Sequence, residues 1–175
     1  PGYPFSTSLG MQFAPQVREP WEIYVNSYGK RFVREDHPSV HAREHALLKQ
    51  DEQRFFIVLD EGIRQNAPPI NPMMGDKINE KFGQHPHYSK AATLDELAIK
   101  IGVPASNLKA TVQNFNQAVE TGEDGEFGRL RMFRKVEMPP FYAIHAGGIT
   151  VVSPAGLNAN KNLEVLKIDG SPIPN

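Results

Sequence analysis

The sequence predicts an α+β domain with a mostly antiparallel sheet and several helices. Short apolar segments typical of strands and longer segments with helical spacing both occur, and they do not form a repeated strand–helix–strand pattern. A doubly wound parallel sheet requires that repeat, so the antiparallel arrangement is favoured. The chain has 175 residues, of which 39% are hydrophobic and 22% are charged, a composition typical of one globular domain that buries its own core.

A β-hairpin is predicted within EIYVNSYGKRFVRED, residues 22–36. Its arms, residues 22–25 and 30–34, are rich in β-branched and aromatic residues. The loop between the arms ends at Gly29, which can adopt positive φ without steric cost. The preceding residues 1–21 contain four prolines and little periodicity, which predicts an extended and mostly irregular segment.

Three elements are predicted between the hairpin and the middle of the chain. Pro38 in a first helical turn, followed by apolar residues, predicts a helix of about three turns. RFFIVLD, residues 54–60, is a continuous apolar run with polar boundaries and predicts a strand buried on both faces. The proline-rich residues 66–74 predict a loop that leads into a short helix at residues 76–82.

Two capped helices are predicted in the second half of the chain. Thr93 and Glu96 form a capping box, in which both side chains bind free backbone N–H groups at the start of a helix over residues 94–100. Ser106 is expected to cap a second helix that ends at Gly122. The apolar stripe of this second helix consists of Leu108, Val112, Phe115 and Val119. Further strands are predicted at residues 141–144, 149–152 and 164–168.

Charge and composition argue against several functional classes. The 19 basic and 20 acidic residues give a net charge of -1 and no global field that attracts nucleic acid, so no nucleic-acid partner is expected. The absence of cysteine excludes disulfides and thiolate metal sites and fits a reducing compartment, so a cytoplasmic location is expected. No signal peptide and no apolar run long enough to span a membrane is visible, so no membrane segment is expected in this chain.

Motifs in the same order along residues 22–174 resemble the capping domain of the FAD-dependent fumarate reductase, succinate dehydrogenase and 3-ketosteroid dehydrogenase family. The first motif is VNxxGKRFxxE, residues 25–35. The second is the helix pair and polar loop of residues 92–129, which end in FGR. PPFYAI and GLNANKNLEVLKIDGSPIP then resemble the family's return to its flavin domain.

The resemblance implies that FAD is the cofactor of the parent protein and that this chain covers the substrate of an oxidoreductase acting on a carbon–carbon bond. Residues 1–21 would then lead into the domain, residues 22–140 would form the cap, and residues 141–175 would return toward a flavin-binding domain of the same protein. That domain and a small-molecule substrate are the expected partners. Because the chain starts at Pro1 without Met, a piece of a longer protein is expected.

The glycine fingerprint of a dinucleotide site is missing from the sequence. GxGxxG lets a pyrophosphate approach a helix N-terminus, and the chain contains no such motif. The glycine cluster of residues 122–128 has the wrong spacing and contains acidic residues that repel phosphate. No cofactor-binding residue is therefore assigned, and the chain is not expected to hold FAD tightly or to be active without the flavin-binding domain.

The resemblance points to Ser39 as one candidate site residue. In family members that act on fumarate, an arginine four positions after the motif glutamate donates the proton, and ketosteroid dehydrogenases have a tyrosine there. Counting from Glu35 reaches Ser39, whose hydroxyl is a poor acid near neutral pH. The alternative is that Ser39 only caps a helix. His37 titrates in a useful range, and Arg43 is the next donor candidate if the count is displaced.

The same count places Arg18 on the arginine of the family's proton relay. Pro15 stands where the relay glutamate is expected, and Val151 and Val152 occupy the region of the family's active-site histidine. The alternative for Arg18 is a surface salt bridge. The sequence therefore matches the family better than it matches any single reaction of the family, and fumarate reduction is not expected.

Two other functional classes remain open. HAREH, residues 41–45, has the HxxEH pattern of inverted zinc peptidases, in which two histidines share a helix face with a glutamate base. A zinc-dependent hydrolase is therefore an alternative, although a solvent-facing polar stripe explains the same five residues and no metal ligand is assigned. A non-catalytic interaction module is the other alternative.

Overall fold

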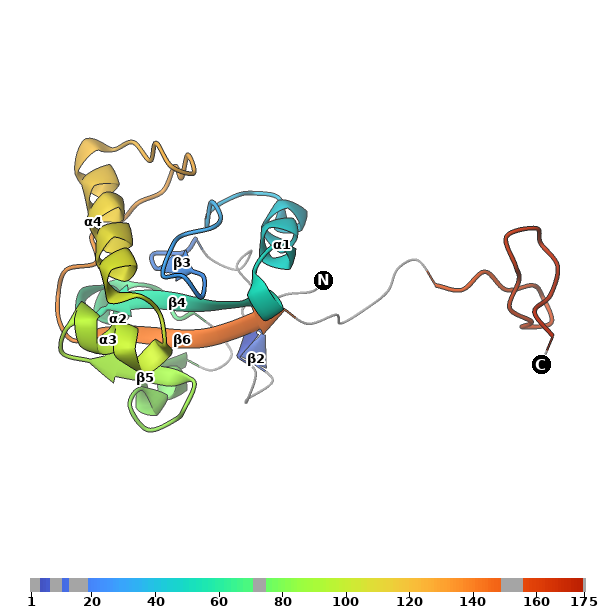
Figure 1. Cartoon of the computed structure of the whole chain (residues 1–175), viewed down its shortest axis with the longest axis horizontal. Coiled ribbons are helices and arrows are strands. Elements are labelled where there is room, and N and C mark those ends of the chain that lie inside the picture. The colour runs from blue at the N-terminus through green and yellow to red at the C-terminus, as the bar shows by residue number, and fades with distance from the viewer. Residues whose placement is uncertain (1–3, 7–10, 13–18, 71–74, 149–155, 175) are drawn as a thin grey trace.

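The sheet of the computed structural model is built around β6 (Phe141–Gly148), which pairs with other strands along both edges. β4 (Arg54–Asp60) covers one edge, and the other edge is shared by β5 (Tyr88–Ala91) and β1 (Pro4–Ser6). Figure 1 shows β4 and β6 side by side across the middle of the molecule. The structure describes residues 4–6, 11–12, 19–70, 75–148 and 156–174.

Two more strands complete a six-stranded sheet. β2 (Met11–Gln12) pairs with β1, and β3 (Ile23–Val25) pairs with β4. The strand order is β2-β1-β6-β4-β3 with β5 beside β6, and every pair is antiparallel. The predicted α+β class with a mostly antiparallel sheet is confirmed.

The predicted hairpin forms only in part. Its first arm corresponds to β3, but its second arm is reduced to one bridge between Val25 and Arg31. β3 pairs instead with β4, while the Arg31 side chain is buried in ion pairs. The turn is as expected, because Gly29 has a φ of +70°.

Both faces of β4 are covered, as its continuous apolar run predicts. Ile57 and Val58 are neighbours whose side chains point to opposite faces, and both are fully buried. α3 (Leu94–Ile101) packs on β5 and β6, and Leu47 of α1 (Val40–Leu48) lies against Gly148 at the end of β6. Helices on the sheet therefore exclude water from its central strands.

The capping box of α3 is confirmed. Thr93 Oγ1 accepts from the Glu96 N–H at 3.2 Å, and Glu96 Oε2 accepts from the Ala92 N–H at 2.9 Å. The helix ends at Gly102, which has left-handed backbone geometry.

The predicted cap of the next helix is wrong. α4 (Ala105–Thr121) begins after Pro104, and no side chain caps it. Ser106 lies inside the first turn, because the Pro104 carbonyl already accepts the first helical bonds. The predicted stop at Gly122 is confirmed by its φ of +76°.

The start of α4 is bound to the hairpin turn. Thr111 Oγ1 donates to the Gly29 carbonyl at 2.7 Å, and Asn107 Nδ2 donates to the Tyr28 carbonyl at 2.9 Å. A Cβ on Gly29 would lie 3.1 Å from the Leu108 nitrogen, so glycine is required for this close approach as well as for its positive φ.

The other helices are short. α1 starts one residue after Ser39, so Pro38 precedes the cap instead of lying in the first turn. The 3₁₀ helix η1 (Asp51–Gln53) precedes β4, and α2 (Glu61–Asn66) follows it directly. A second 3₁₀ helix, η2 (Gly75–Lys81), stands where the short helix was predicted.

The strand predicted at residues 164–168 does not form. Residues 164–168 make only isolated bridges, Ala159 with Val165 and Leu166 with Pro172, in a segment that Figure 1 shows apart from the sheet. The predicted strand at residues 149–152 lies outside the described residues. β1, β2 and β5 were not predicted, because each has two to four residues and is defined by pairing with a strand far along the chain.

Replacing Phe115 by alanine tests the core assignment. The Phe115 side chain is 1% exposed on the buried stripe of α4, so the change should lower the free energy of unfolding by about 3–5 kcal/mol. Urea unfolding followed by circular dichroism measures this difference. Ile99→Ala on α3 is the matched control, because Ile99 is 78% exposed. A loss below about 1 kcal/mol for Phe115→Ala would contradict the assignment.

Candidate functional site

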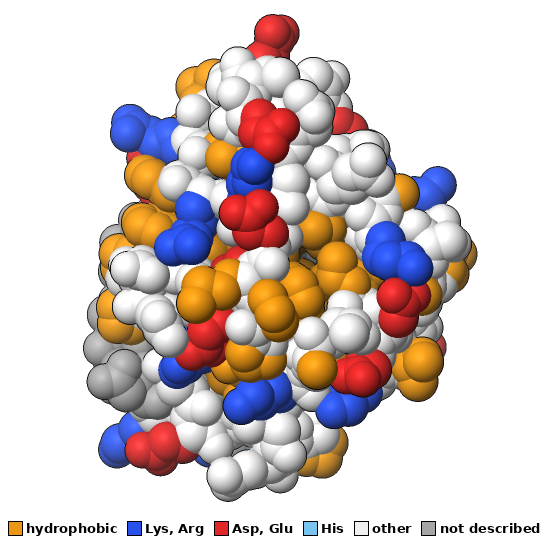
Figure 2. Space-filling model, turned by 90° about the vertical axis from the view of Figure 1, so that its left-hand side faces the viewer, with side chains coloured by type: hydrophobic (Ala, Val, Ile, Leu, Met, Phe, Trp, Pro, Cys, Tyr) orange, Lys and Arg blue, Asp and Glu red, His pale blue; other side chains and the backbone are white. Residues whose placement is uncertain are grey.

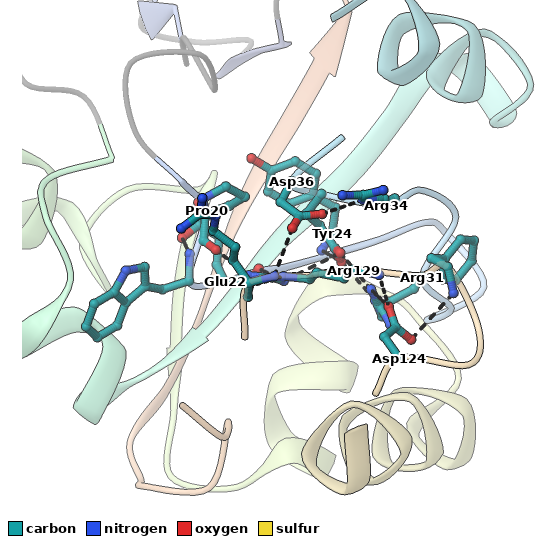
Figure 3. Close-up of polar contacts among 12 residues, drawn as sticks. Pro20, Glu22, Tyr24, Arg31, Arg34, Asp36, Asp124 and Arg129 are labelled. Carbon is teal, nitrogen blue, oxygen red and sulfur yellow. Dashed lines mark hydrogen bonds and ion pairs between the residues drawn. The ribbon is translucent and has the colours of Figure 1, made fainter. Parts of the chain in front are cut away.

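Two of the sequence motifs meet in a buried ion network (Figure 3). Arg31 donates from Nε and Nη2 to the two Glu35 oxygens at 2.9 and 2.7 Å. Its Nη1 and Nη2 also donate to the two Asp124 oxygens at 3.1 and 2.8 Å. Glu35 Oε1 additionally accepts from the Tyr24 N–H of β3 at 3.2 Å. The hairpin is thereby joined to a loop that lies 93 residues away.

Arg129 extends the network toward the start of the domain. Its Nη1 lies 3.4 Å from Glu35 Oε2 and donates to the Glu22 carbonyl at 2.8 Å, and its Nη2 donates to the Pro20 carbonyl. The guanidinium groups of Arg31 and Arg129 also lie over the Phe115 ring, 5.5 and 5.1 Å from its centroid. The network is therefore continuous with the apolar core.

The charges in this network compensate one another. Burial raises the pKa of Asp124, but the hydrogen bonds and charge of Arg31 outweigh burial and hold the pKa below its usual value. The Glu35 carboxylate is fully buried and bound by both arginines. Arg31 and Arg129 thus neutralise the charges of Glu35 and Asp124. We therefore assign the network a structural role.

Ser39 and His37 lie together at the N-terminus of α1. Ser39 Oγ accepts from the Ala42 N–H at 3.3 Å and caps the helix. The Ser39 N–H donates to His37 Nδ1 at 3.0 Å, so in this arrangement the other ring nitrogen, Nε2, carries the hydrogen of a neutral His37. The structure thus supports the capping interpretation of Ser39, and its role in chemistry remains a prediction.

Arg43 lies one turn further along α1. Its Nη1 donates to the Glu35 carbonyl at 3.3 Å, and its Nε is buried without a hydrogen-bond partner. Burial lowers the pKa of Arg43 from its usual value, against the opposing charges of Tyr24, Asp36 and Glu44. A partly buried guanidinium with unused donors is therefore present next to the predicted donor position.

Arg18 and Pro15 lie outside the described residues, as do Val151 and Val152. Their predicted roles are not tested.

The two histidines of HAREH lie on an exposed face of α1. The His41 and His45 rings lie 4.2 Å apart, and His41 Nδ1 is 3.8 Å from Glu44 Oε2. Across the ranges that the structure describes, no three histidine or carboxylate side chains are grouped as a metal site. The zinc alternative is therefore not favoured.

Comparison with known proteins identifies the family. The profile described as "FAD binding domain" matches residues 8–175. The chain belongs to this family. The FAD binding domain match supports FAD as the cofactor of the parent protein, as the resemblance implied.

Three similar proteins agree with this assignment. An NADH:acrylate oxidoreductase of Vibrio harveyi is 32% identical over 86% of this chain and 14% of its own length. The open form of a flavocytochrome c3 fumarate reductase matches 98% of this chain and 29% of its own, with 26% identity and a TM-score of 0.73. The 3-ketosteroid delta1-dehydrogenase of Sterolibacterium denitrificans matches 87% and 31%, with 26% identity and a TM-score of 0.63. The chain thus spans less than a third of each of these relatives.

The glycine-bearing loop of residues 122–128 does not fit the pyrophosphate of FAD. In the glycine-bearing loop, the Asp124 carboxylate accepts from the N–H groups of Glu126, Phe127 and Arg129 at 3.1–3.4 Å. A phosphate would need those N–H groups, and the carboxylate would repel it. The loop is therefore a structural turn whose Asp124 is buried.

Sequence reasoning missed a histidine pair between β6 and the loop before β5. His87 Nδ1 lies 3.0 Å from His145 Nδ1, so the two rings share one hydrogen. Burial lowers the pKa of both histidines, and the nearby Arg54 lowers both further. The pair is therefore neutral near pH 7, and His145 lines a groove of about 380 Å³. No motif signals it, because the two residues are 58 positions apart.

On the face that Figure 2 shows, charged side chains of one sign do not form a separate patch. Basic and acidic side chains are interspersed there around a group of hydrophobic side chains. Within the described residues, no helix combines the length and the apolar character that crossing a bilayer requires.

Glu35→Gln tests the structural role of the network. Removing this charge leaves two buried arginines with one carboxylate, so the free energy of unfolding should fall by about 3–5 kcal/mol. Glu126→Gln is the matched control, because Glu126 is 3.8 Å from Arg31 and its side chain is 46% exposed. It should change stability by less than about 1 kcal/mol. Denaturant unfolding measures both, and equal effects would contradict the role of Glu35.

Proposed function

We propose that this chain is the capping domain of an FAD-dependent oxidoreductase that acts on a carbon–carbon bond of a small molecule. The proposal rests on the share of each chain that the structural match covers. The match to a fumarate reductase covers 98% of this chain but only 29% of that enzyme. With no pyrophosphate fingerprint in the sequence, this supports a chain that covers the substrate while a flavin-binding domain of the same protein holds FAD.

The proposal changes one boundary of the predicted division of the chain. Residues 1–21 lead into the domain, and the cap, predicted to cover residues 22–140 before a return over residues 141–175, extends through β6. β6 is the central strand of the cap sheet, so the return would start after Gly148. Exposed apolar side chains beyond that point could pack on the flavin-binding domain; these are Leu157, Leu163, Ile168 and Ile173.

The cap would exclude water from the substrate and position polar groups against it. Ser39, His37 and Arg18 are the predicted contacts. The Ser39 oxygen is occupied as an acceptor by the Ala42 N–H, which leaves its hydroxyl hydrogen available as a donor.

The purified 175-residue chain should be colourless, and the full-length protein should contain about one FAD per chain. The reason is that this chain lacks the glycines that bind a pyrophosphate. Absorbance near 450 nm after gel filtration measures the flavin content. Near-stoichiometric flavin on the 175-residue chain would contradict the capping assignment, and a flavin-free full-length protein would favour an interaction module.

The full-length enzyme should show no appreciable fumarate reductase activity. Ser39 at the donor position lacks both the acidity and the carboxylate-pairing fork of arginine, so a less charged substrate is expected. The Vibrio harveyi relative is named for acrylate, which carries one carboxylate. Oxidation of reduced viologen by fumarate is the assay, with crotonate as the one-carboxylate comparison. Robust turnover of fumarate would contradict this prediction.

A further inference from the structure

Two histidines join the loop before β5, residues 83–87, to the central strand β6. His87 Nδ1 in the loop lies 3.0 Å from His145 Nδ1 on β6, and the His145 N–H donates to the His87 carbonyl at 2.9 Å. Phe56, which pairs with His145 across β4 and β6, stacks on the His145 ring with centroids 5.1 Å apart. One backbone bond and one contact between rings therefore attach His87 to the sheet.

The contact between the two rings depends on how many protons they carry. Two Nδ1 atoms at this distance are bonded only when one of them holds a hydrogen and the other accepts it. A neutral pair meets this condition, and so does a pair with one charged ring. When both rings are charged, both Nδ1 atoms carry hydrogens and two positive charges face each other. The doubly charged pair therefore cannot keep the contact.

The surroundings of the pair disfavour positive charge. Burial lowers the pKa of both rings, and the charge of Arg54 on β4 lowers both further. His85 also lowers the pKa of His87. Glu52 of η1 acts in the opposite direction on His145, but it forms an ion pair with Arg54 at 2.8 Å. The other charged side chains that line the groove beside His145 have opposite signs; these are Asp51 and Lys100.

We propose that His87 and His145 form a pH-sensitive latch that holds residues 83–87 on β6 near neutral pH and releases them in acid. Pro86 in the loop and His145 on β6 both line the groove of about 380 Å³, together with Phe56. Release of the loop therefore changes the width of this groove. Neither a flavin nor a substrate takes part, so the latch is independent of the proposed function.

Amide hydrogen exchange of the full-length protein, corrected for the intrinsic effect of pH, measures the release. The closed latch has lowered pKa values, so the open form takes up protons first as the pH falls below the ordinary histidine value of about 6.5. Each proton taken up on opening raises the opening constant about tenfold per pH unit. Between about pH 7.5 and about pH 5, residues 83–91 should lose at least about tenfold in protection, while α4 keeps its protection.

His145→Asn and His87→Asn remove the titration and keep a bonding group. The asparagine amide does not titrate, and it can donate to a neutral histidine or accept from a charged one. Both variants should lose most of the pH dependence of exchange in residues 83–91. His41→Asn is the matched control, because the His41 side chain on α1 is 75% exposed and lies outside the pair. This variant should show the wild-type pH dependence.

NMR titration of the histidine rings in the wild type keeps the test decisive if a variant does not fold. The ring signals of His87 and His145 should titrate over the pH range in which residues 83–91 lose protection. The latch is overturned if these residues keep their protection at about pH 5, or if the rings titrate without any change in the loop. It is also overturned if both asparagine variants keep the wild-type pH dependence, or if α4 loses protection equally, which indicates global unfolding.

Discussion

The buried pairing of Arg31 and Arg129 with Glu35 and Asp124 is the interaction on which the rest of the domain depends. It joins the hairpin to a loop 93 residues later, and Arg129 binds the backbone at Pro20 and Glu22. Such a network contributes little net stability when complete, yet it is costly to break, because any lost partner leaves a buried charge. It therefore selects one arrangement of distant segments, which the apolar core beside Phe115 then stabilises.

This constraint changes how the motif VNxxGKRFxxE is understood. Its arginine and glutamate, Arg31 and Glu35, bind each other and are fully committed to the scaffold. Side chains with free chemical capacity lie just after the motif, at the start of α1, where Ser39 caps the helix and Arg43 has an unused donor. The motif thus builds the scaffold, and the side chains just after it keep hydrogen-bonding capacity that the scaffold does not use.

Elements with strong local signals were predictable. β4 has the predicted bounds because a continuous apolar run is buried on both faces, and α3 follows from its capping box and closing glycine. Elements defined by pairing were not predictable: β1, β2 and β5 are too short to show periodicity and exist because β6 or β1 lies beside them. Ser106 shows the limit of local rules, since Pro104 starts the helix two residues earlier.

The sequence by itself determined the α+β class, most of the helices, the buried strand β4 and the family, because these depend on local periodicity, caps and ordered motifs. It also indicated that Ser39 starts a helix. Only the tertiary structure decided which charges are compensated. Arg31, Arg43 and Arg129 have the same chemistry in the sequence, but two face buried carboxylates across the fold and one does not. Asp124 for Arg31 and Glu35 for Arg129 are counterions that lie far along the chain, so no local pattern shows that these arginines are compensated.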